Sequence, residues 1–406
     1  MAKKEQVPAI RFQGFADPWE QRKLSEVVGV YDGVHQTPHY TDSGVMFLSV
    51  ENIATLTSQK FISEEAFERD YRVYPQKGDV LMTRIGDVGT PNVVETSEKL
   101  AFYVSLALLK PIEIDSYFLC NAIQSPRFKK GLKDRTLVTA IPQKINKDEI
   151  GKVDILMPES ASEQAQIGTY FHQLDTLITL HQRKYDKLVA IKRSMLEKMF
   201  PREGSRFPEI RFAGFTDPWE QRKLGELVQF SKGTGYSKAD LKEFGTPIIL
   251  YGRLYTKYET VIADVDTFAD AKQGSVYSHG GEVIVPASGE TAEDISIASV
   301  VEKSGVLLGG DLNIITPSAD LDSAFLAISI SNGKPHEDMA KMAQGKSVVH
   351  LHNTDLEKID LAYPSHEEQT QISGFFRGID NLITLHQRKL EKLQAIKRSM
   401  LEKMFV

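Results

Sequence analysis

Two stretches of the sequence contain residue types that bind phosphates in other proteins. AKMAQGKS at 340–347 ends like a phosphate-binding P-loop, but Ala340 replaces the first glycine and no apolar strand leads into it. KGTG at 232–235 has only a lone G-x-G spacing, which is a weak pattern. His350 and His352 follow the first stretch, yet the sequence offers them no nucleophile or metal partner. These patterns predict no catalytic residue.

The sequence DPWEQRKL occurs twice, at 17–24 and at 217–224. Its Asp-Pro-Trp is similar to the D-P-P-[YFW] loop of amino-methyltransferases, but the second proline is missing and no cofactor-type glycine-rich loop precedes either copy. In each copy the Asp suits the N-cap, the Pro the first position and the Glu the third position of a short helix. We therefore expect a helix here, with Trp19 and Trp219, the only tryptophans, as packing anchors.

The length and composition fit two ordinary domains. A chain of 406 residues with 41% hydrophobic content is long enough for each of two domains to bury its own core. The single cysteine, Cys120, cannot form an internal disulfide, and the first residues lack the apolar region of a signal peptide. The apolar run at 101–109 is too short to cross a bilayer as a helix. We expect a cytoplasmic protein with no membrane contact.

The chain is an internal tandem repeat. The near-identical pairs are 10–24 with 210–224, and 177–200 with 382–405. Between these flanks, the blocks Ser25–Met157 and Gly225–Tyr363 share no such identity. Weaker similarities persist inside them, because GDVLMTRIGDVGT from Gly78 resembles GEVIVPASGETAE from Gly281, each an alternating strand followed by a turn with glycine. The blocks are interpreted as one α/β fold that carries two different surfaces.

Each repeat ends in a long helix. Ser160 with Glu163, and Ser365 with Glu368, have the S-x-x-E spacing of a capping box, so each helix should start there. Apolar residues then follow a heptad pattern, which is typical of a coiled coil. The residues that form or widen this stripe include Ile167, Phe171, Leu174, Ile178, Leu180 and Leu188 in the first helix, and Ile372, Phe376, Ile379, Ile383, Leu385 and Leu393 in the second. The stripe is wider than a two-helix seam, so another surface should cover part of it.

His181 and His386 occupy equivalent seam positions in the two helices. A metal site is one hypothesis for them, but no Cys/His cluster of ligand spacing accompanies either residue. The favoured interpretation is that these polar residues fix the register of the helices.

The short linker at 201–209 limits how the pieces are arranged. The second block must lie beside the C-terminal end of the first helix, and the second helix must run back antiparallel to bury its seam. Its end then returns to the first block. This predicts a circular, pseudo-twofold organisation in which each DPWEQRKL lies where a block meets the end of a helix.

These features together are similar to a known family. The tandem of divergent blocks, each opened by W-E-Q-R-K-L and closed by P…EQ.QI…F…(I/L)D.LITLHQRK, resembles the DNA-specificity subunit of type I restriction-modification systems. The resemblance implies two α/β (α+β) target recognition domains in tandem and an antiparallel coiled-coil spacer made of two helices. The implied parts are target recognition domains at 1–160 and 210–365, spacer helices at 161–200 and 366–406, and a linker at 201–209.

The resemblance also implies a function. Each domain would read one half of a split site in double-stranded DNA, and the helices would set the gap and dock two methyltransferase subunits, with restriction/translocase subunits joining the complex. The chain itself would be non-catalytic and hold no cofactor, because S-adenosylmethionine, ATP and Mg²⁺ would bind the partner subunits. A spacer helix from Glu163 to Phe200 would span about 57 Å, enough to hold two domains roughly one DNA turn, ~34 Å, apart.

DNA contacts need basic and polar side chains on turns, because Lys and Arg bind phosphates and base edges. The candidates are Arg84, Lys129, Lys130, Arg135 and Lys144 in the first block, and Lys232, Tyr236, Lys238, Arg253, Lys257 and Lys346 in the second. The net charge of −6 neither indicates nor excludes a DNA-binding protein, since the local field decides binding. The alternative is a coiled-coil scaffold whose blocks bind proteins rather than DNA.

Overall fold

The computed structural model describes residues 7–345 and 348–405. The chain divides into two compact units, unit 1 with residues 1–182 and 388–406, and unit 2 with residues 183–387. Each unit combines small sheets with helices, as the sequence predicted for the α/β class. Each also contains one part of both long helices, α6 (Ala161–Lys198) and α12 (His366–Met404).

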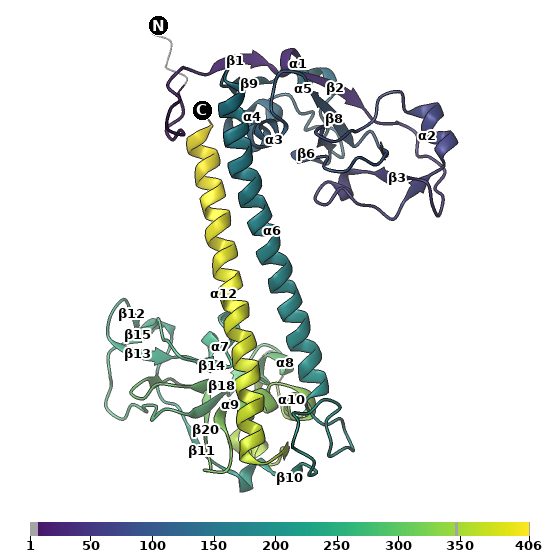
Figure 1. Cartoon of the computed structure of the whole chain (residues 1–406). Coiled ribbons are helices and arrows are strands. Elements are labelled where there is room, and N and C mark those ends of the chain that lie inside the picture. The colour runs from purple at the N-terminus through teal and green to yellow at the C-terminus, as the bar shows by residue number, and fades with distance from the viewer. Residues whose placement is uncertain (1–6, 346–347, 406) are drawn as a thin grey trace. The chain divides into compact units, whose positions relative to one another are not determined.

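Unit 1 is built on a four-stranded antiparallel sheet in the order β2-β8-β5-β6, next to a three-stranded sheet, β4-β3-β7, and a two-stranded sheet, β1-β9 (Figure 1). The strands are β1 (Glu20–Lys23), β2 (Val28–Asp32), β3 (Val45–Leu48), β4 (Phe61–Ile62), β5 (Val80–Ile85), β6 (Asp87–Val93), β7 (Leu100–Phe102), β8 (Leu106–Pro111) and β9 (Asp154–Met157). The shorter helices are α1 (Leu24–Val27), η1 (Val50–Asn52), α2 (Glu64–Asp70), α3 (Ser116–Gln124), α4 (Pro126–Lys133) and α5 (Lys147–Gly151).

Unit 2 repeats this plan with a larger sheet, β11-β20-β16-β18-β14, a four-stranded sheet, β12-β15-β13-β19, and the pairs β10-β22 and β17-β21. The strands are β10 (Glu220–Lys223), β11 (Val228–Lys232), β12 (Leu241–Lys242), β13 (Thr246–Ile249), β14 (Val261–Ile262), β15 (Phe268–Ala269), β16 (Glu282–Pro286), β17 (Ser288–Gly289), β18 (Ser299–Val301), β19 (Leu307–Leu308), β20 (Leu312–Pro317), β21 (Val349–His350) and β22 (Asp360–Tyr363). The shorter helices are η2 (Leu224–Glu226), η3 (Lys238–Asp240), α7 (Gly252–Thr256), α8 (Ala292–Ile295), α9 (Ser323–Ile330), α10 (Gly333–Met342) and α11 (Asn353–Leu356).

The central strands β5 and β16 are buried on both faces. In β5, Val80 and Met82 face the core that α3, α4 and the long helices complete, whereas Leu81 belongs to a second core under the three-stranded sheet. In β16, Val283 and Ile284 divide between two cores in the same way. The sequence predicted both strands correctly, but not that each would be covered on both sides.

The prediction of a short helix at DPWEQRKL was wrong. Glu20–Lys23 forms strand β1, which pairs antiparallel with β9, and Glu220–Lys223 forms β10, which pairs with β22 in the same register. Each pair joins the start of a block to its last strand, just before the long helix. The backbone hydrogen bonds that these ladders provide, together with burial of the adjacent tryptophan, outweigh the local helix-capping preference of Asp-Pro.

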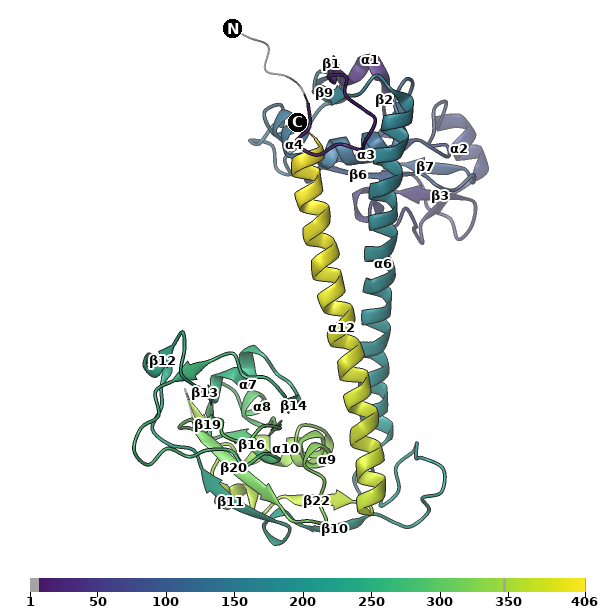
Figure 2. The ribbon, with the colours of Figure 1, turned by 60° about the vertical axis from the view of Figure 1, so that its left-hand side comes forward.

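Within each unit the two long helices run in opposite directions (Figures 1 and 2). In unit 1, Lys397 of α12 forms an ion pair with Asp175 of α6, at 2.6 Å. In unit 2 the equivalent residues exchange helices, because Lys192 of α6 pairs with Asp380 of α12, also at 2.6 Å. The antiparallel direction predicted from the short linker therefore holds within each unit.

Candidate nucleic-acid interface

Four aromatic rings meet where the first block contacts both long helices. Trp19 packs edge-to-face on Phe118 of α3 and on Phe405, with ring centroids 5.6 and 6.0 Å apart. Phe171 of α6 lies 5.8 Å from Phe405. All four side chains are buried. The end of α12 is therefore part of the core of unit 1.

Unit 2 builds the same cluster from equivalent residues. Trp219 contacts Phe200, which follows α6, and Phe325 of α9, at 5.8 and 5.7 Å between ring centroids. Phe376 of α12 lies 6.3 Å from Phe200. We call these two clusters, with the residues around them, the joints. In each joint, the aromatic residue just after the end of one long helix packs into the core of a block. The other long helix begins at that same block.

The backbone also ties each joint to a helix end. The amide of Ile10 donates to the carbonyl of Lys403 at 3.1 Å, and the amide of Ile210 donates to the carbonyl of Lys198 at 2.9 Å. These carbonyls belong to the last turn of a helix, where no partner exists inside the helix. The repeated sequence thus marks where a block meets the end of a helix, as the sequence predicted.

A buried ion pair fixes the start of each long helix to its joint. Both nitrogens of the Arg11 guanidinium fork donate to Glu163, at 2.5 and 2.7 Å, and Arg211 binds Glu368 in the same way at 2.7 Å twice. The two carboxylates are 1% exposed, and the hydrogen bond to Glu163 raises the pKa of Arg11. Bidentate geometry of this kind is what a buried Arg–carboxylate pair requires.

At Ser160 and Glu163, only one of the two hydrogen bonds of the predicted capping box is present. Ser160 does accept a hydrogen bond from the amide of Glu163, at 3.3 Å. The carboxylate of Glu163, however, accepts from Arg11 and from the indole nitrogen of Trp19 rather than from the amide of its own N-cap. Sequence reasoning missed Arg11 and Arg211, although both lie in the repeated I-R-F that precedes DPWEQRKL.

The glutamine after each of these glutamates binds the N-terminus of a second, shorter helix. The side-chain oxygen of Gln164 accepts from the amide of Asp115, the N-cap of α3, and its nitrogen donates to the carbonyl of Pro158, both at 2.8 Å. Gln369 binds the amide of Asp322, the N-cap of α9, at 2.9 Å in the same way. The repeated Glu-Gln therefore sets the position of each long helix against the block that precedes it.

Arg84 was predicted as a DNA contact on a turn, but it lies inside strand β5 and is 5% exposed. Its guanidinium forms an ion pair with Asp32 and donates to the carbonyl of Ile145 at 3.1 Å. Burial lowers the pKa of Arg84. The side chain holds the sheet to the loop after α4 and does not present a free donor to a ligand.

Two candidates in the second block are also buried. Arg253 of α7 is 8% exposed and pairs with Glu259 at 2.8 Å and with Asp266 at 2.5 Å. Tyr236 is 7% exposed, and its hydroxyl lies 2.5 Å from that of Ser275. Charge neutralisation and packing account for both residues, so neither presents a free side chain to DNA.

The remaining candidates of the first block cluster after α3. Lys129 and Lys130 lie exposed on α4, where Lys130 also pairs with Asp134 at 2.7 Å. Arg135 is half-buried and donates to a carbonyl in α4, whereas Lys144 is exposed in the loop that follows. Four of the five predicted residues of this block thus lie in one continuous segment of the chain, 129–144.

The remaining candidates of the second block are more dispersed. Lys232 at the end of β11 and Lys238 in η3 are exposed. Lys257 is exposed and hydrogen-bonds Asp266, and this bond, with Arg253, lowers the pKa of that carboxyl to about 2. Lys346 lies outside the described residues.

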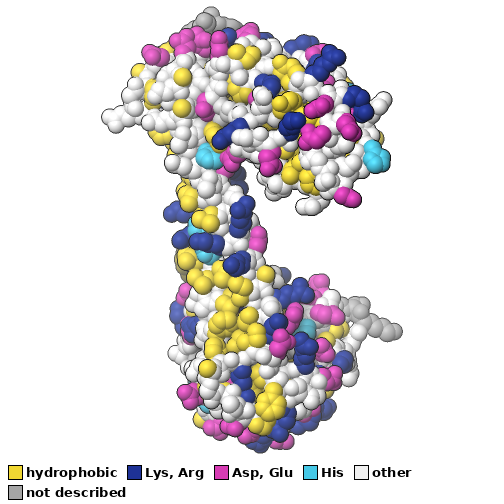
Figure 3. Space-filling view, turned by 45° about the vertical axis from the view of Figure 1, so that its right-hand side comes forward, with side chains coloured by type: hydrophobic (Ala, Val, Ile, Leu, Met, Phe, Trp, Pro, Cys, Tyr) yellow, Lys and Arg dark blue, Asp and Glu magenta, His cyan; other side chains and the backbone are white. Residues whose placement is uncertain are grey.

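The predicted helix stripe divides into buried ends and an exposed middle. The residues buried against the blocks are Ile167, Phe171, Leu174, Ile372, Phe376 and Ile379. The partly buried residues are Ile178, Leu188, Ile383 and Leu393. Leu180 and Leu385 are 44% and 45% exposed, and Leu177 and Leu382 are similarly exposed. Hydrophobic side chains are visible along the helical part of the surface in Figure 3.

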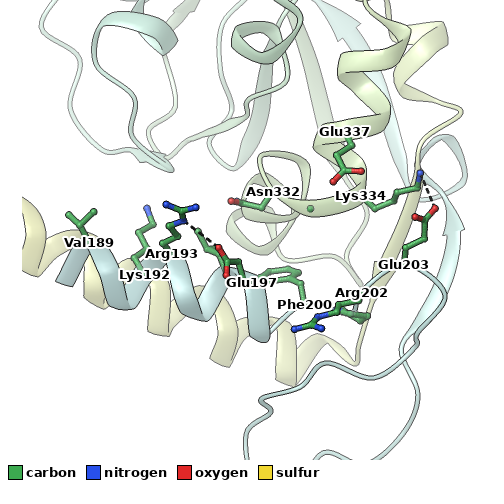
Figure 4. Close-up of a pocket in the computed structure, with 13 residues that line it drawn as sticks. Val189, Lys192, Arg193, Glu197, Phe200, Arg202, Glu203, Asn332, Lys334 and Glu337 are labelled. Atoms are coloured by element: carbon green, nitrogen blue, oxygen red, sulfur yellow. Dashed lines mark hydrogen bonds and ion pairs between the residues drawn. The ribbon is translucent and has the colours of Figure 1, made fainter. Parts of the chain in front are cut away.

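A groove of about 620 Å³ lies in unit 2 between the last turns of α6 and the connection from α9 to α10 (Figure 4). Leu196 and Phe200 form part of its apolar floor. Its basic side chains are paired with carboxylates. Arg193 binds Glu197 and Lys334 binds Glu203, both at 3.3 Å, and Lys192 and Arg202 bind Asp380 and Glu209 at 2.6 and 3.1 Å. The groove is suited to contact with a protein surface rather than to binding of a small anion.

The described part of the chain offers no metal site. Among residues 7–345 and 348–405, no group of three His, Cys, Asp or Glu side chains could hold a metal ion. His181 and His386 are partly buried at equivalent positions, and their role in register stays a prediction. Burial raises the pKa of the Cys120 thiol to about 12, so it is protonated at neutral pH. No described helix is long and apolar enough to span a membrane.

Comparison with known proteins identifies the repeated unit. A sequence model of the type I restriction modification DNA specificity domain matches residues 16–190 and again 216–395. The MjaVIII specificity subunit of a type I restriction enzyme from Methanocaldococcus jannaschii is 23% identical over 281 residues, which are 66% of this chain and 65% of that protein. The chain therefore spans slightly less than two thirds of this relative.

Two further proteins align over nearly the whole chain. A putative specificity subunit, MjaX, from the same organism is 21% identical over 95% of this chain and 92% of its own length. The crystal structure of a type I S subunit from M. genitalium covers 98% of this chain and 99% of its own, with a TM-score of 0.68 at 13% identity. At that identity the likeness concerns the fold.

The Glu163 ion pair generates a prediction about stability. Glu163→Ala should destabilise unit 1 by about 3–5 kcal/mol, because it leaves the buried Arg11 charge uncompensated. Replacing both residues by methionine should recover most of this loss. In a Trp219→Phe background, Trp19 is the only tryptophan, so its fluorescence during urea unfolding reports unit 1 alone. The exposed Glu65→Ala is the control, and equal midpoints for Glu163→Ala and this control would contradict the assignment.

Proposed function

The chain belongs to the family of type I restriction-modification DNA specificity proteins, and we propose that its two blocks each read one half of a split, asymmetric site in double-stranded DNA. One observation carries this proposal. The two units share their joints residue for residue, while their exposed basic side chains differ in number and position. Two copies of one scaffold with different surfaces suit two different half-sites.

The long helices would set the gap between the half-sites. Helix α6 has 38 residues, which corresponds to about 57 Å at a rise of 1.5 Å per residue. This length exceeds one turn of B-DNA, roughly 34 Å. Because each joint contains the start of one helix and the end of the other, the helix length would fix the gap and each block would fix only its own bases.

The exposed middle of the helices would dock methyltransferase subunits. Leu177 and Leu180 on α6, and Leu382 and Leu385 on α12, are between 42% and 46% exposed and occur at equivalent positions. Since the surface exists in two copies, we infer two methyltransferase subunits. In unit 2 the groove lined by Leu196 and Phe200 would extend this contact.

The chain would act without catalysis of its own. Its acidic and basic side chains at the joints are committed to ion pairs and helix caps, as for Arg11 and Glu163. Methyl transfer to adenine, DNA translocation and cleavage would belong to methyltransferase and restriction subunits, which would bind S-adenosylmethionine, ATP and Mg²⁺. The chain would deliver these subunits to the site.

Exchange of one block tests the proposal. Replacing Ser25–Met157 by the block of another family member should change one half of the methylated motif and leave the other half and the gap unchanged, because the tryptophan, the Arg–Glu pair and the helix ends of the joint lie outside the exchanged segment. The motif is read from the methylome of cells that carry the chimera and its partner genes. The reciprocal exchange of Gly225–Tyr363 is the control, and a change in both halves after either exchange would refute modular reading.

The docking surface generates a second prediction. Leu180→Glu together with Leu385→Glu should reduce assembly with methyltransferase subunits at least tenfold, since charges would replace apolar contacts, while both units stay folded. Assembly is measured by analytical ultracentrifugation. Ile112→Glu with Phe244→Glu, at exposed apolar positions on the blocks, is the matched control. Intact assembly of the helix variant would mean that another surface docks these subunits.

A further inference from the structure

The segment after α4 in the first block has an unusual combination of charge and exposed apolar side chains. Between residues 126 and 147 there are seven Lys or Arg residues and one acidic residue, Asp134, although the whole chain has a net charge of −6. In the same segment Leu137, Val138 and Ile141 are 45%, 65% and 100% exposed. Exposed β-branched residues so close together, one of them fully exposed, indicate a contact surface rather than scattered surface residues.

This segment is a short, firmly anchored hairpin. The amide of Leu137 donates to the carbonyl of Lys144 at 2.8 Å, and the pairing encloses Val138 and Ile141 at its tip. Below the tip, Ile145 is fully buried and its amide donates to the carbonyl of Arg84 at 3.0 Å. The Arg84 side chain, which is held by Asp32, also donates to the carbonyl of Ile145 and so stiffens the base of the hairpin.

The second block has an equivalent backbone anchor. After α10, Gln344 and His350 exchange both backbone hydrogen bonds, at 3.1 and 2.8 Å, and the buried Leu351 donates to the carbonyl of Ala287 at 3.0 Å. Val348, which precedes His350 by two residues, is 49% exposed. The anchoring hydrogen bonds of Ile145 and Leu351 are equivalent in the two blocks.

We propose that the hairpin Leu137–Lys144 enters the major groove of the half-site read by the first block, where Val138 and Ile141 make apolar contacts with base edges. This inference rests on the proposed function. The width of the major groove admits a two-stranded ribbon, and the C5-methyl group of thymine is an apolar target there. The exposed Lys129, Lys130 and Lys133 of α4 bind the flanking phosphates.

The lysines around this surface favour DNA over a protein as its partner. An apolar patch that docks a protein needs few charges at its centre, whereas lysines around an apolar tip suit a polyanion. Lys144 at the hairpin and Lys147 at the start of α5 are also exposed. Of these lysines, Lys130 has a carboxylate partner, Asp134.

The test uses the full chain in complex with its methyltransferase subunits, and duplexes that carry the motif found in the methylome. Fluorescence anisotropy compares the intact motif with two duplexes in which the half read by the first block, or the other half, is scrambled. Val138→Ser with Ile141→Ser should reduce discrimination against the scrambled first half roughly tenfold or more. The dependence of log K on log salt should not change, since no phosphate contact is lost.

Two matched variants complete the design. Lys129→Ala with Lys130→Ala should weaken binding to all three duplexes alike and make the salt slope shallower by about 2. Val348→Ser should affect discrimination of the other half only. Unchanged first-half discrimination in the tip variant would overturn the inference, as would loss of methyltransferase assembly in its place. If the unmodified complex fails to prefer the intact motif, the proposed function itself fails.

Discussion

The structure depends on one constraint, which is that neither block can complete its core without the end of a helix that begins on the other block. Phe405 fills the first core between Trp19 and Phe171, and Phe200 fills the second beside Trp219. The bidentate pairs Arg11–Glu163 and Arg211–Glu368 then fix the angle at which each long helix leaves its block. Because such clusters and pairs tolerate little displacement, the joints preserve the geometry of the helices while the surfaces of the blocks vary.

This constraint explains which parts of the sequence repeat. The near-identical segments contribute the tryptophans, the arginines and the last turns of the helices, and a Glu-Gln dipeptide is repeated near the start of each long helix; all of these lie at the joints. The segments that differ contribute the hairpin after α4 and the small second sheets. A scaffold that must be built twice needs the same contacts twice, whereas two recognition surfaces need different ones.

Sequence reasoning reached the architecture but not the site. The repeat, the heptad pattern and the short linker were sufficient to predict the two long helices and their antiparallel direction within each unit. The strand at Glu20–Lys23 was missed because a distant partner, β9, outweighs the local signals. Arg84, Arg253 and Tyr236 were chosen by residue type and by an expected position on turns, and neither criterion reveals burial. The exposed tip at Val138 and Ile141 was missed because apolar residues in a sequence are normally assigned to a core.

If the contacts at the joints are what attach each helix end to its block, the covalent linker at 201–209 is not required for that attachment. Ile10 contacts Lys403 without a covalent link, just as Ile210 contacts Lys198 beyond the linker. The most direct measurement is the methylome of cells that carry, with the partner genes, only a permuted gene, opened within 201–209 and with Val406 joined to Met1 by a flexible linker. The account predicts the same split motif with the same gap. An altered gap, or no soluble permutant across several linker lengths, would contradict it.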